Sequence, residues 1–125
     1  MTFSIEYIKI ASYLGAGISI GIGAIATGIG LGTIAGEGTK ALSVQPKAND
    51  VIFRTMLTGQ AVTETGAIFA LVVSLLLLFG GFNQGGWFRF FAFLGAGLGM
   101  GIGSLGPSLG AGFSGGQACK SIGRM

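Results

Sequence analysis

Three long apolar stretches dominate the pattern of hydrophobic and polar positions. Residues 10–36 and 90–116 carry no formal charge, and residues 55–82 carry one acid. Each stretch exceeds the roughly 20 residues that a helix needs to cross about 30 Å of hydrocarbon, and none shows a polar face at the helical period. The pattern predicts an all-α membrane protein with helices over about 10–42 and about 55–82, a polar loop over about 43–54, and a short outer connection and third transmembrane helix within 83–125.

The basic residues indicate which side each connection faces. Because the chain crosses twice between them, the polar loop and the C-terminus lie on the same side. Five basic residues gather there, and two lie opposite: Lys40, Lys47, Arg54, Lys120 and Arg124 against Lys9 and Arg89. The positive-inside rule therefore predicts that loop 43–54 and the C-terminus are cytoplasmic and that the N-terminus lies on the opposite side.

Composition narrows the class further. The chain has 26 glycines in 125 residues, 50% hydrophobic and 9% charged residues, and a mean hydropathy of +0.79, which excludes an ordinary soluble domain. One cysteine and no histidine give poor support for zinc or iron–sulfur sites, and no cofactor is expected. The net charge of +3 is scattered and forms no nucleic-acid face. A GxGxxG string at 101–106 lies inside an uncharged span, without the strand and acid that dinucleotide binding requires.

The glycines recur at spacings of four, which favours helix packing. Small residues at this spacing let neighbouring helices approach closely in a membrane. The first helix carries such sets, and comparable sets in the third helix indicate a tightly packed oligomer. The predicted packing residues are Gly17, Gly21, Gly28, Gly32 and Gly36.

An internal repeat relates the third helix to the first. Residues 14–44 align with 94–124 at an offset of 80 without a gap, and Leu-Gly-Ala-Gly opens both segments. The repeat stops at Met125, the counterpart of Gln45, where a loop is expected to begin. This suggests that the chain is truncated or incomplete before a fourth helix.

Glu64 is the one acid within the three apolar stretches. It lies ten residues after Arg54, or about 15 Å along a helix, near the bilayer centre. A charged acid at that depth costs at least about 2.5–3.5 kcal/mol, so Glu64 should be neutral or cation-paired whenever it faces lipid. Such a residue is by default a functional site, here one that carries an ion.

Taken together, the glycine-repeat helix, the Gln45-Pro46 loop, the segment 55–65 around Glu64 and the apolar run 71–79 resemble the proteolipid c subunit of rotary F-type ATP synthases. The resemblance covers residues 14–79 as a hairpin and 94–124 as the first helix of a second. It implies a ring with glycine-rich inner helices, formed alone or with other c-type subunits. It also implies contact of Gln45 and Pro46 with the central stalk, and ion exchange at Glu64 beside stator subunit a. Such a subunit is not itself an enzyme.

Departures from the family pattern favour the proton as the transported ion. In sodium-binding members a glutamine stands where this chain has Leu31, although Thr65 and the Val62 carbonyl fit such a site, and Gln60 could donate to Glu64 or act as a ligand. A sodium ion would then lack oxygens, whereas a proton needs one acceptor. Sodium transport by the same rotor remains the alternative. A small oligomeric channel and a structural glycine-zipper membrane protein are the other classes.

Overall fold

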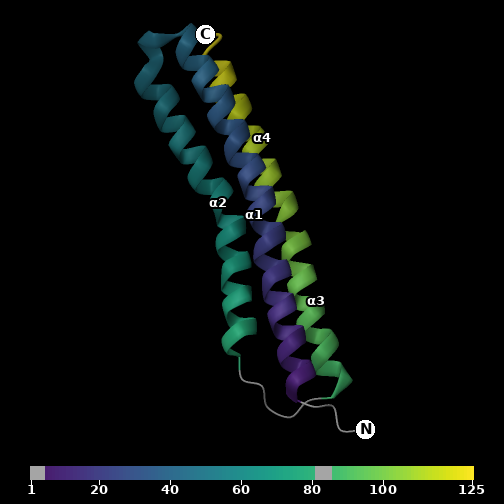
Figure 1. Ribbon diagram of the computed structural model, residues 1–125. Helices are drawn as coiled ribbons and strands as arrows, with labels where there is room; N and C mark the ends of the chain where they lie inside the picture. The colour runs from purple at the N-terminus through teal and green to yellow at the C-terminus, as the bar shows by residue number, and fades with distance from the viewer. Residues whose placement is uncertain (1–4, 81–85) are drawn as a thin grey trace.

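The computed structural model describes residues 5–80 and 86–125, which form a bundle of long helices (Figure 1). The elements are α1 (Ile5–Val44), η1 (Pro46–Ala48), α2 (Asn49–Phe79), α3 (Trp87–Gly103) and α4 (Leu105–Ile122). No strand occurs within these described ranges. Three helical spans, with α3 and α4 counted as one, are long and apolar enough to cross a membrane. The prediction of an all-α membrane protein is confirmed.

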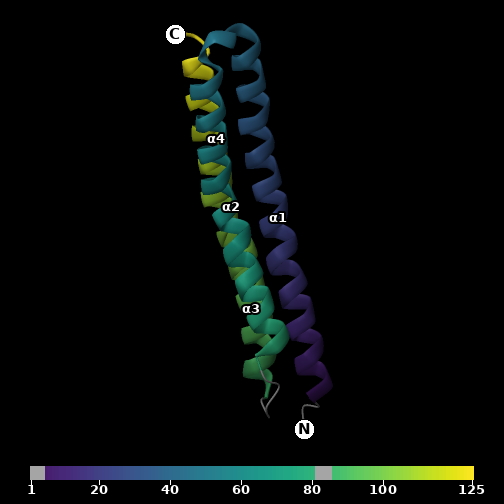
Figure 2. The ribbon, with the colours of Figure 1, turned by 90° about the vertical axis from the view of Figure 1, so that its left-hand side faces the viewer.

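The helices form an antiparallel hairpin with a third helical span laid along it. α1 and α2 run in opposite directions, and α3 with α4 runs parallel to α1 (Figures 1 and 2). α1 packs against both other spans, and α2 also packs against α4. The connection containing η1 lies at the same end of the bundle as the C-terminus, and the N-terminus lies at the other end (Figure 1).

The connection between α1 and α2 is shorter than the loop predicted over 43–54. α1 continues to Val44, and α2 already begins at Asn49. Gln45 adopts φ −128° and ψ 73° because the following Pro46 disfavours helical backbone at the preceding residue. Asp50 lies in the first turn of α2, where an acid is favoured, and its carboxylate accepts a hydrogen bond from Arg54 Nε at 3.1 Å. Asp50 and Arg54, which fall within the predicted loop, therefore lie on α2.

The other helix bounds also differ from the predicted ones. α1 begins at Ile5 rather than near residue 10, and α2 ends at Phe79 rather than near 82. The predicted outer connection falls mainly on residues 81–85, outside the described part of the chain. At about 1.5 Å per residue, the 40 residues of α1 extend over about 60 Å, so its ends project beyond the hydrocarbon.

Small side chains line the face of α1 that packs within the chain. The buried positions recur every three or four residues, and most are glycine, alanine, serine or threonine: Ile8, Ala11, Ser12, Gly15, Ala16, Ser19, Gly23, Ala26, Thr27, Gly30, Ile34, Gly38 and Ala41. Two of them hydrogen-bond across the hairpin. Ser12 Oγ donates to the Leu77 carbonyl, and Ser19 Oγ donates to the Ala70 carbonyl at 3.0 Å. The helices therefore approach closely enough for side chain-to-backbone bonds.

Replacing Ser19 with Ala should weaken the hairpin, because it removes a buried interhelical hydrogen bond. Bonds of this kind contribute about 0.6–1.7 kcal/mol in membrane proteins, so we expect a loss of that size in the free energy of unfolding. Unfolding of the purified chain in mixed micelles by increasing dodecyl sulfate measures it. Ser43→Ala is the matched control, since among the described residues the exposed Ser43 hydroxyl bonds only to the Lys40 carbonyl on its own helix. Equal losses in both variants would contradict the prediction.

The third span is interrupted at Ser104, between α3 and α4. Pro107 has no N–H group and cannot donate to the carbonyl four residues earlier, at Gly103. The ladder continues on either side, where the Ser104 N–H donates to Met100 O at 3.0 Å and the Ser108 N–H donates to Ser104 O at 3.2 Å. The span therefore stays nearly continuous and follows α1 along its length.

Glycines hold the third span directly against α1. A Cβ on Gly97 would collide with the Gly15 backbone, and one on Gly112 would collide with the Gly30 backbone. A Cβ on Gly123 would lie 2.8 Å from Ala41 Cβ. The partners in each pair are 82 residues apart, close to the repeat offset of 80, so equivalent levels of the two repeats lie side by side.

Candidate functional site

Glu64 lies at the centre of α2. Fifteen residues separate it from Asn49 and another fifteen from Phe79, the two ends of that helix. Its side chain is exposed, and within the described part of the chain its carboxylate has no hydrogen-bond or ion-pair partner. In a membrane, this exposed surface faces lipid or another protein chain. The structure therefore presents a single carboxyl group at mid-span depth.

The carboxyl group opens onto a groove between α1 and α2 with a volume of 370 Å³. The lining is apolar apart from Glu64 itself and Thr27: Ile20, Ala24, Thr27, Gly28 and Leu31 from α1, with Glu64, Ala67, Ile68 and Leu71 from α2. Such surroundings disfavour a lone charge.

The structure brings together two of the three other predicted ion ligands. The Thr65 hydroxyl donates to the Val62 carbonyl at 2.7 Å, one turn back along α2. Both residues are exposed, and neither lines the groove that contains Glu64. Gln60 is half-buried and has no side-chain hydrogen bond within the described part of the chain. Leu31, where sodium-binding relatives are expected to have a glutamine, does line the groove.

Behind Glu64, three helices meet at a buried hydroxyl cluster that the sequence pattern did not reveal. Thr63 and Ser108 are 0% and 1% exposed, and Thr27 is 4% exposed. The Thr27 hydroxyl donates to Ser108 Oγ at 3.2 Å, which links α1 to α4. Ser108 also fills the space beside Gly66, where a Cβ would collide with its hydroxyl. α4 therefore packs directly against the acid-bearing helix at the level of Gly66.

The predicted packing glycines do not contact another helix of the same chain. A Cβ on Gly17, Gly21, Gly28, Gly32 or Gly36 would meet nothing within 4 Å. The packing within the chain uses a second, interleaved set of glycines: Gly15, Gly23, Gly30 and Gly38. The predicted set therefore forms an open strip on α1, which we call the open glycine face.

The connecting segment places Gln45 and Pro46 at the end of the bundle. The Gln45 N–H donates to the Ala41 carbonyl at 2.9 Å, and the Gln45 carbonyl accepts a bond from the Ala48 N–H at 3.1 Å. Pro46 is exposed, and Gln45 is half-buried. No group of three or more metal-binding side chains occurs among the described residues. The site thus consists of one mid-span carboxyl group and a short exposed turn at the end of the hairpin.

Comparison with known proteins finds similarity to ATP synthase c subunits. The sequence profile of the ATP synthase C-subunit family matches residues 14–77, which include Glu64 and end before α3. The ATP synthase c subunit of Alkaliphilus oremlandii (strain OhILAs) is 50% identical over 74 residues, covering 59% of this chain and 83% of that protein. The ATP synthase c subunit of Natranaerobius thermophilus is 52% identical over 69 residues, covering 55% of this chain and 79% of that protein. The chloroplastic ATP synthase c subunit of Ostreococcus tauri is 46% identical over 69 residues, covering 55% of this chain and 84% of that protein.

Proposed function

The chain belongs to the ATP synthase C-subunit family, and from this premise we propose that it is an ion-carrying subunit of a synthase rotor ring. It is a membrane protein and a component of the synthase complex without catalysis of its own. The observation that carries the proposal is the unpaired Glu64 carboxyl group at the middle of α2, in an apolar groove. Each turn of the ring would carry one ion per Glu64 between two half-channels in stator subunit a.

The transported ion is the proton in this proposal, with sodium as the alternative. The groove offers few oxygens besides the carboxylate, since Leu31 and the other α1 residues beside it are apolar except for Thr27. The Thr27 hydroxyl donates to Ser108 on α4. Sodium requires several oxygen ligands, whereas a proton requires only the carboxylate itself. The Thr65 hydroxyl and Val62 carbonyl are the ligands that would favour sodium.

Carbodiimide labelling distinguishes the two ions. N,N′-dicyclohexylcarbodiimide reacts with a protonated carboxyl group in an apolar setting, so labelling of Glu64 should increase as pH falls. Sodium chloride should give no more protection than potassium chloride at the same ionic strength. Mass spectrometry of the labelled chain measures the modified fraction at Glu64, and Glu37 in the same chain is an internal control because it lies beside Lys40. Protection by sodium alone would instead assign sodium as the ion.

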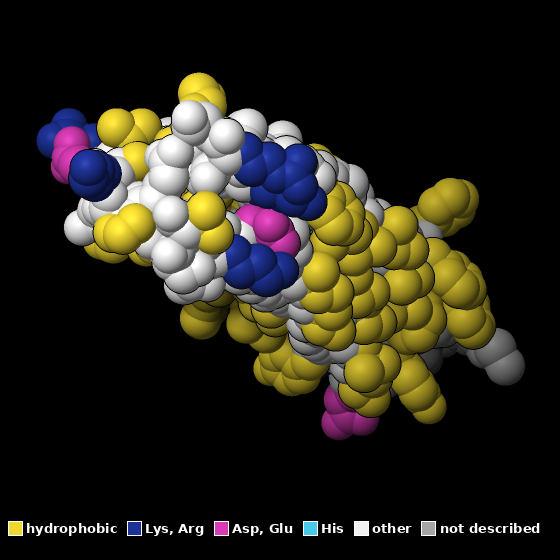
Figure 3. All heavy atoms as spheres, turned by 90° about the horizontal axis from the view of Figure 1, so that it is seen from above, with side chains coloured by type: hydrophobic (Ala, Val, Ile, Leu, Met, Phe, Trp, Pro, Cys, Tyr) yellow, Lys and Arg dark blue, Asp and Glu magenta, His cyan; other side chains and the backbone are white. Residues whose placement is uncertain are grey.

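The end of the bundle with the η1 connection is proposed to face the cytoplasm and the central stalk. Gln45 and Pro46 are exposed or half-exposed there, and the C-terminus lies at the same end (Figure 1). Viewed from that end, Lys and Arg side chains are prominent, and apolar side chains cover the flank of the bundle (Figure 3). This distribution supports the positive-inside assignment. The stalk would contact Gln45 and Pro46 as the ring turns.

The third span is proposed to serve as a second inner helix without an ion-carrying acid. It runs parallel to α1 in near-equivalent register, and α2 packs against both α1 and α4. α3 and α4 also have an open strip of glycines whose Cβ would meet nothing within 4 Å: Gly95, Gly99, Gly103, Gly106 and Gly110. Each chain can therefore offer a glycine strip on α1 and another on α3–α4 to neighbouring subunits. Such a ring would contain one carboxyl group for every two inner helices.

A further inference from the structure

A charged hollow lies between α1 and α4 at the end of the bundle that carries the η1 connection. Its volume is 190 Å³, and we call it the basic hollow. Three of its lining residues are cations, one is an acid, and the rest are small or apolar: Lys40, Lys120, Arg124, Glu37, Ala41 and Val44 are among them. The cations come from both helices, so they converge only because α4 packs beside α1.

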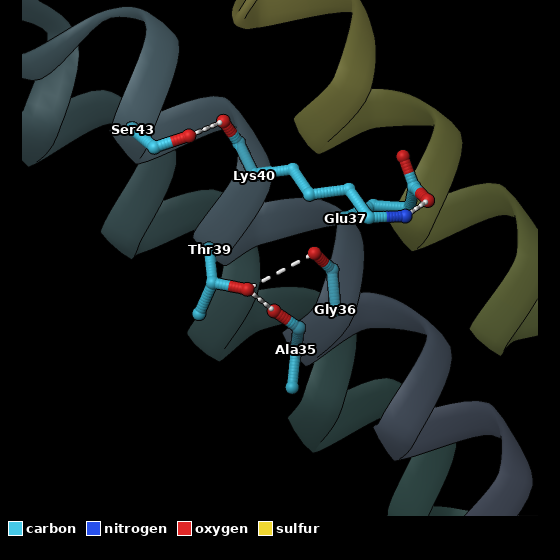
Figure 4. A network of polar contacts seen from close by, with 6 residues as sticks. All are labelled: Ala35, Gly36, Glu37, Thr39, Lys40 and Ser43. Carbon is cyan, nitrogen blue, oxygen red and sulfur yellow. Dashed lines mark hydrogen bonds and ion pairs between the residues drawn. The ribbon is translucent and has the colours of Figure 1, made fainter.

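Glu37 neutralises only part of the positive charge that Lys40, Lys120 and Arg124 bring to the basic hollow. Lys40 Nζ lies 2.9 Å from Glu37 Oε1, and Figure 4 shows the pair with α4 behind it. Glu37 Cγ lies 3.7 Å from the position that a Cβ would occupy on Gly116, so the acid lies against α4. Among the described residues, neither Lys120 nor Arg124 lies within ion-pairing distance of a carboxylate. Two cations therefore remain available to an anion.

The basic hollow lies at the depth of lipid headgroups. Glu37 is the first charged residue of α1 after the uncharged stretch 10–36, and Lys40 follows it one turn later. Val44 is 72% exposed at the rim, and Ala41 forms part of the lining. Basic side chains next to an apolar surface suit the two parts of a phospholipid. Its phosphate can contact the cations, and its acyl chains can lie along the apolar side of the bundle.

We propose that the basic hollow binds the phosphate headgroup of an anionic phospholipid. Lys120 and Arg124 would contact the phosphate oxygens, and Arg is suited to this role because its guanidinium can donate two parallel hydrogen bonds. Basic pockets between transmembrane helices are known to bind such headgroups. A lipid held there would connect α1 and α4 at the end where their glycine contacts stop. The proposal needs only the packing of α4 against α1 and the membrane setting, so it does not depend on which ion Glu64 carries.

Spin-labelled lipids test this proposal on the full chain, reconstituted in phosphatidylcholine vesicles. Electron paramagnetic resonance gives the association constant of spin-labelled phosphatidylglycerol relative to phosphatidylcholine. We expect a preference for phosphatidylglycerol that falls about fivefold for each charge removed in Lys120→Gln and Arg124→Gln, from the attraction of basic residues to anionic lipids. The matched control is Lys47→Gln combined with Arg54→Gln, which removes two charges at the same end but outside the basic hollow. It should retain most of the preference.

Four results would overturn the proposal. The first is no preference for phosphatidylglycerol in the unmodified chain, and the second is an equal loss in the control variant, which would indicate diffuse surface charge. The third is displacement of the spin-labelled lipid by millimolar inorganic phosphate but not by chloride at equal ionic strength, which would assign the site to free phosphate. If the Lys120 and Arg124 variants keep their lipid preference but lose binding to purified central-stalk protein, the basic hollow is a protein contact instead.

Discussion

Replacing Glu64 with Gln is expected to abolish ion-coupled ATP synthesis while the oligomer still assembles. Glutamine has nearly the same size as glutamate but cannot release or take up a proton, so the rotor would carry no ion. The exposed position of Glu64 and its lack of a partner within the described chain imply that no packing or ion pair depends on its charge. Synthesis by the reconstituted synthase in vesicles energised with an acid–base jump should fall to the rate of vesicles without a rotor.

The matched control for this variant is Glu6→Gln. Glu6 is also an exposed glutamate on a membrane-spanning helix, but it lies in the first turn of α1, at the end of the bundle. Its replacement should leave synthesis unchanged. Loss of the assembled oligomer in Glu64→Gln would instead favour a structural role for the acid. Normal synthesis in that variant would exclude Glu64 as the ion carrier.

Two nearby glycines of α1, Gly28 and Gly30, should respond differently to an added side chain. Gly30 faces the interior, where a Cβ would lie 2.6 Å from the Ser108 carbonyl oxygen and 2.7 Å from Thr63 Cγ2. Gly30→Ala should therefore destabilise the fold of the chain by about 1–3 kcal/mol, toward the upper end because the Ser108 backbone cannot yield easily. Gly28 lies on the open glycine face, so Gly28→Ala should leave the stability of the chain unchanged.

A larger side chain on the open glycine face tests the proposed ring. Gly32→Ile, on the same face but outside the groove that contains Glu64, should preserve the fold of the chain but prevent neighbouring subunits from approaching, so the purified protein should lose its oligomeric mass. Dodecyl sulfate unfolding reports the stability of the chain, and native mass spectrometry reports the oligomer. Normal assembly of Gly32→Ile would show that this face does not contact another subunit. Unchanged stability of Gly30→Ala would contradict the close packing of α1 and α4.

The helices and the central acid were predictable because they depend on local properties. Long uncharged runs can satisfy their backbone groups in a membrane only as helices, and counting residues from Arg54 located Glu64 near mid-depth. The length of the connection was not predictable in the same way. Charged residues such as Asp50 and Arg54 are compatible with a helix that extends beyond the hydrocarbon, and the structure places both on α2.

The hydroxyl cluster behind Glu64 was missed because its members look like ordinary small residues. Thr27, Thr63 and Ser108 come from three different helices. Only the packing of these helices brings the Thr27 hydroxyl to Ser108 and the Thr63 methyl group to Gly30 beside Ser108. The same holds for Glu37, because only the packing of α4 against α1 brings Lys120 and Arg124 near it. Polarity patterns along one helix carry no information about which neighbour will complete such a cluster.

The sequence by itself determined the helical class, the membrane setting, the number of spans and the single acid within them. Only the tertiary structure decided which glycines of α1 pack against other helices of the same chain and which remain open. Two glycine sets interleave on α1, and glycine has no side chain to give either set a preferred partner. Close contact with α2, α3 and α4 selects Gly15, Gly23, Gly30 and Gly38, since any Cβ there would collide with a neighbouring helix or side chain. The remaining set stays open for contact outside the chain.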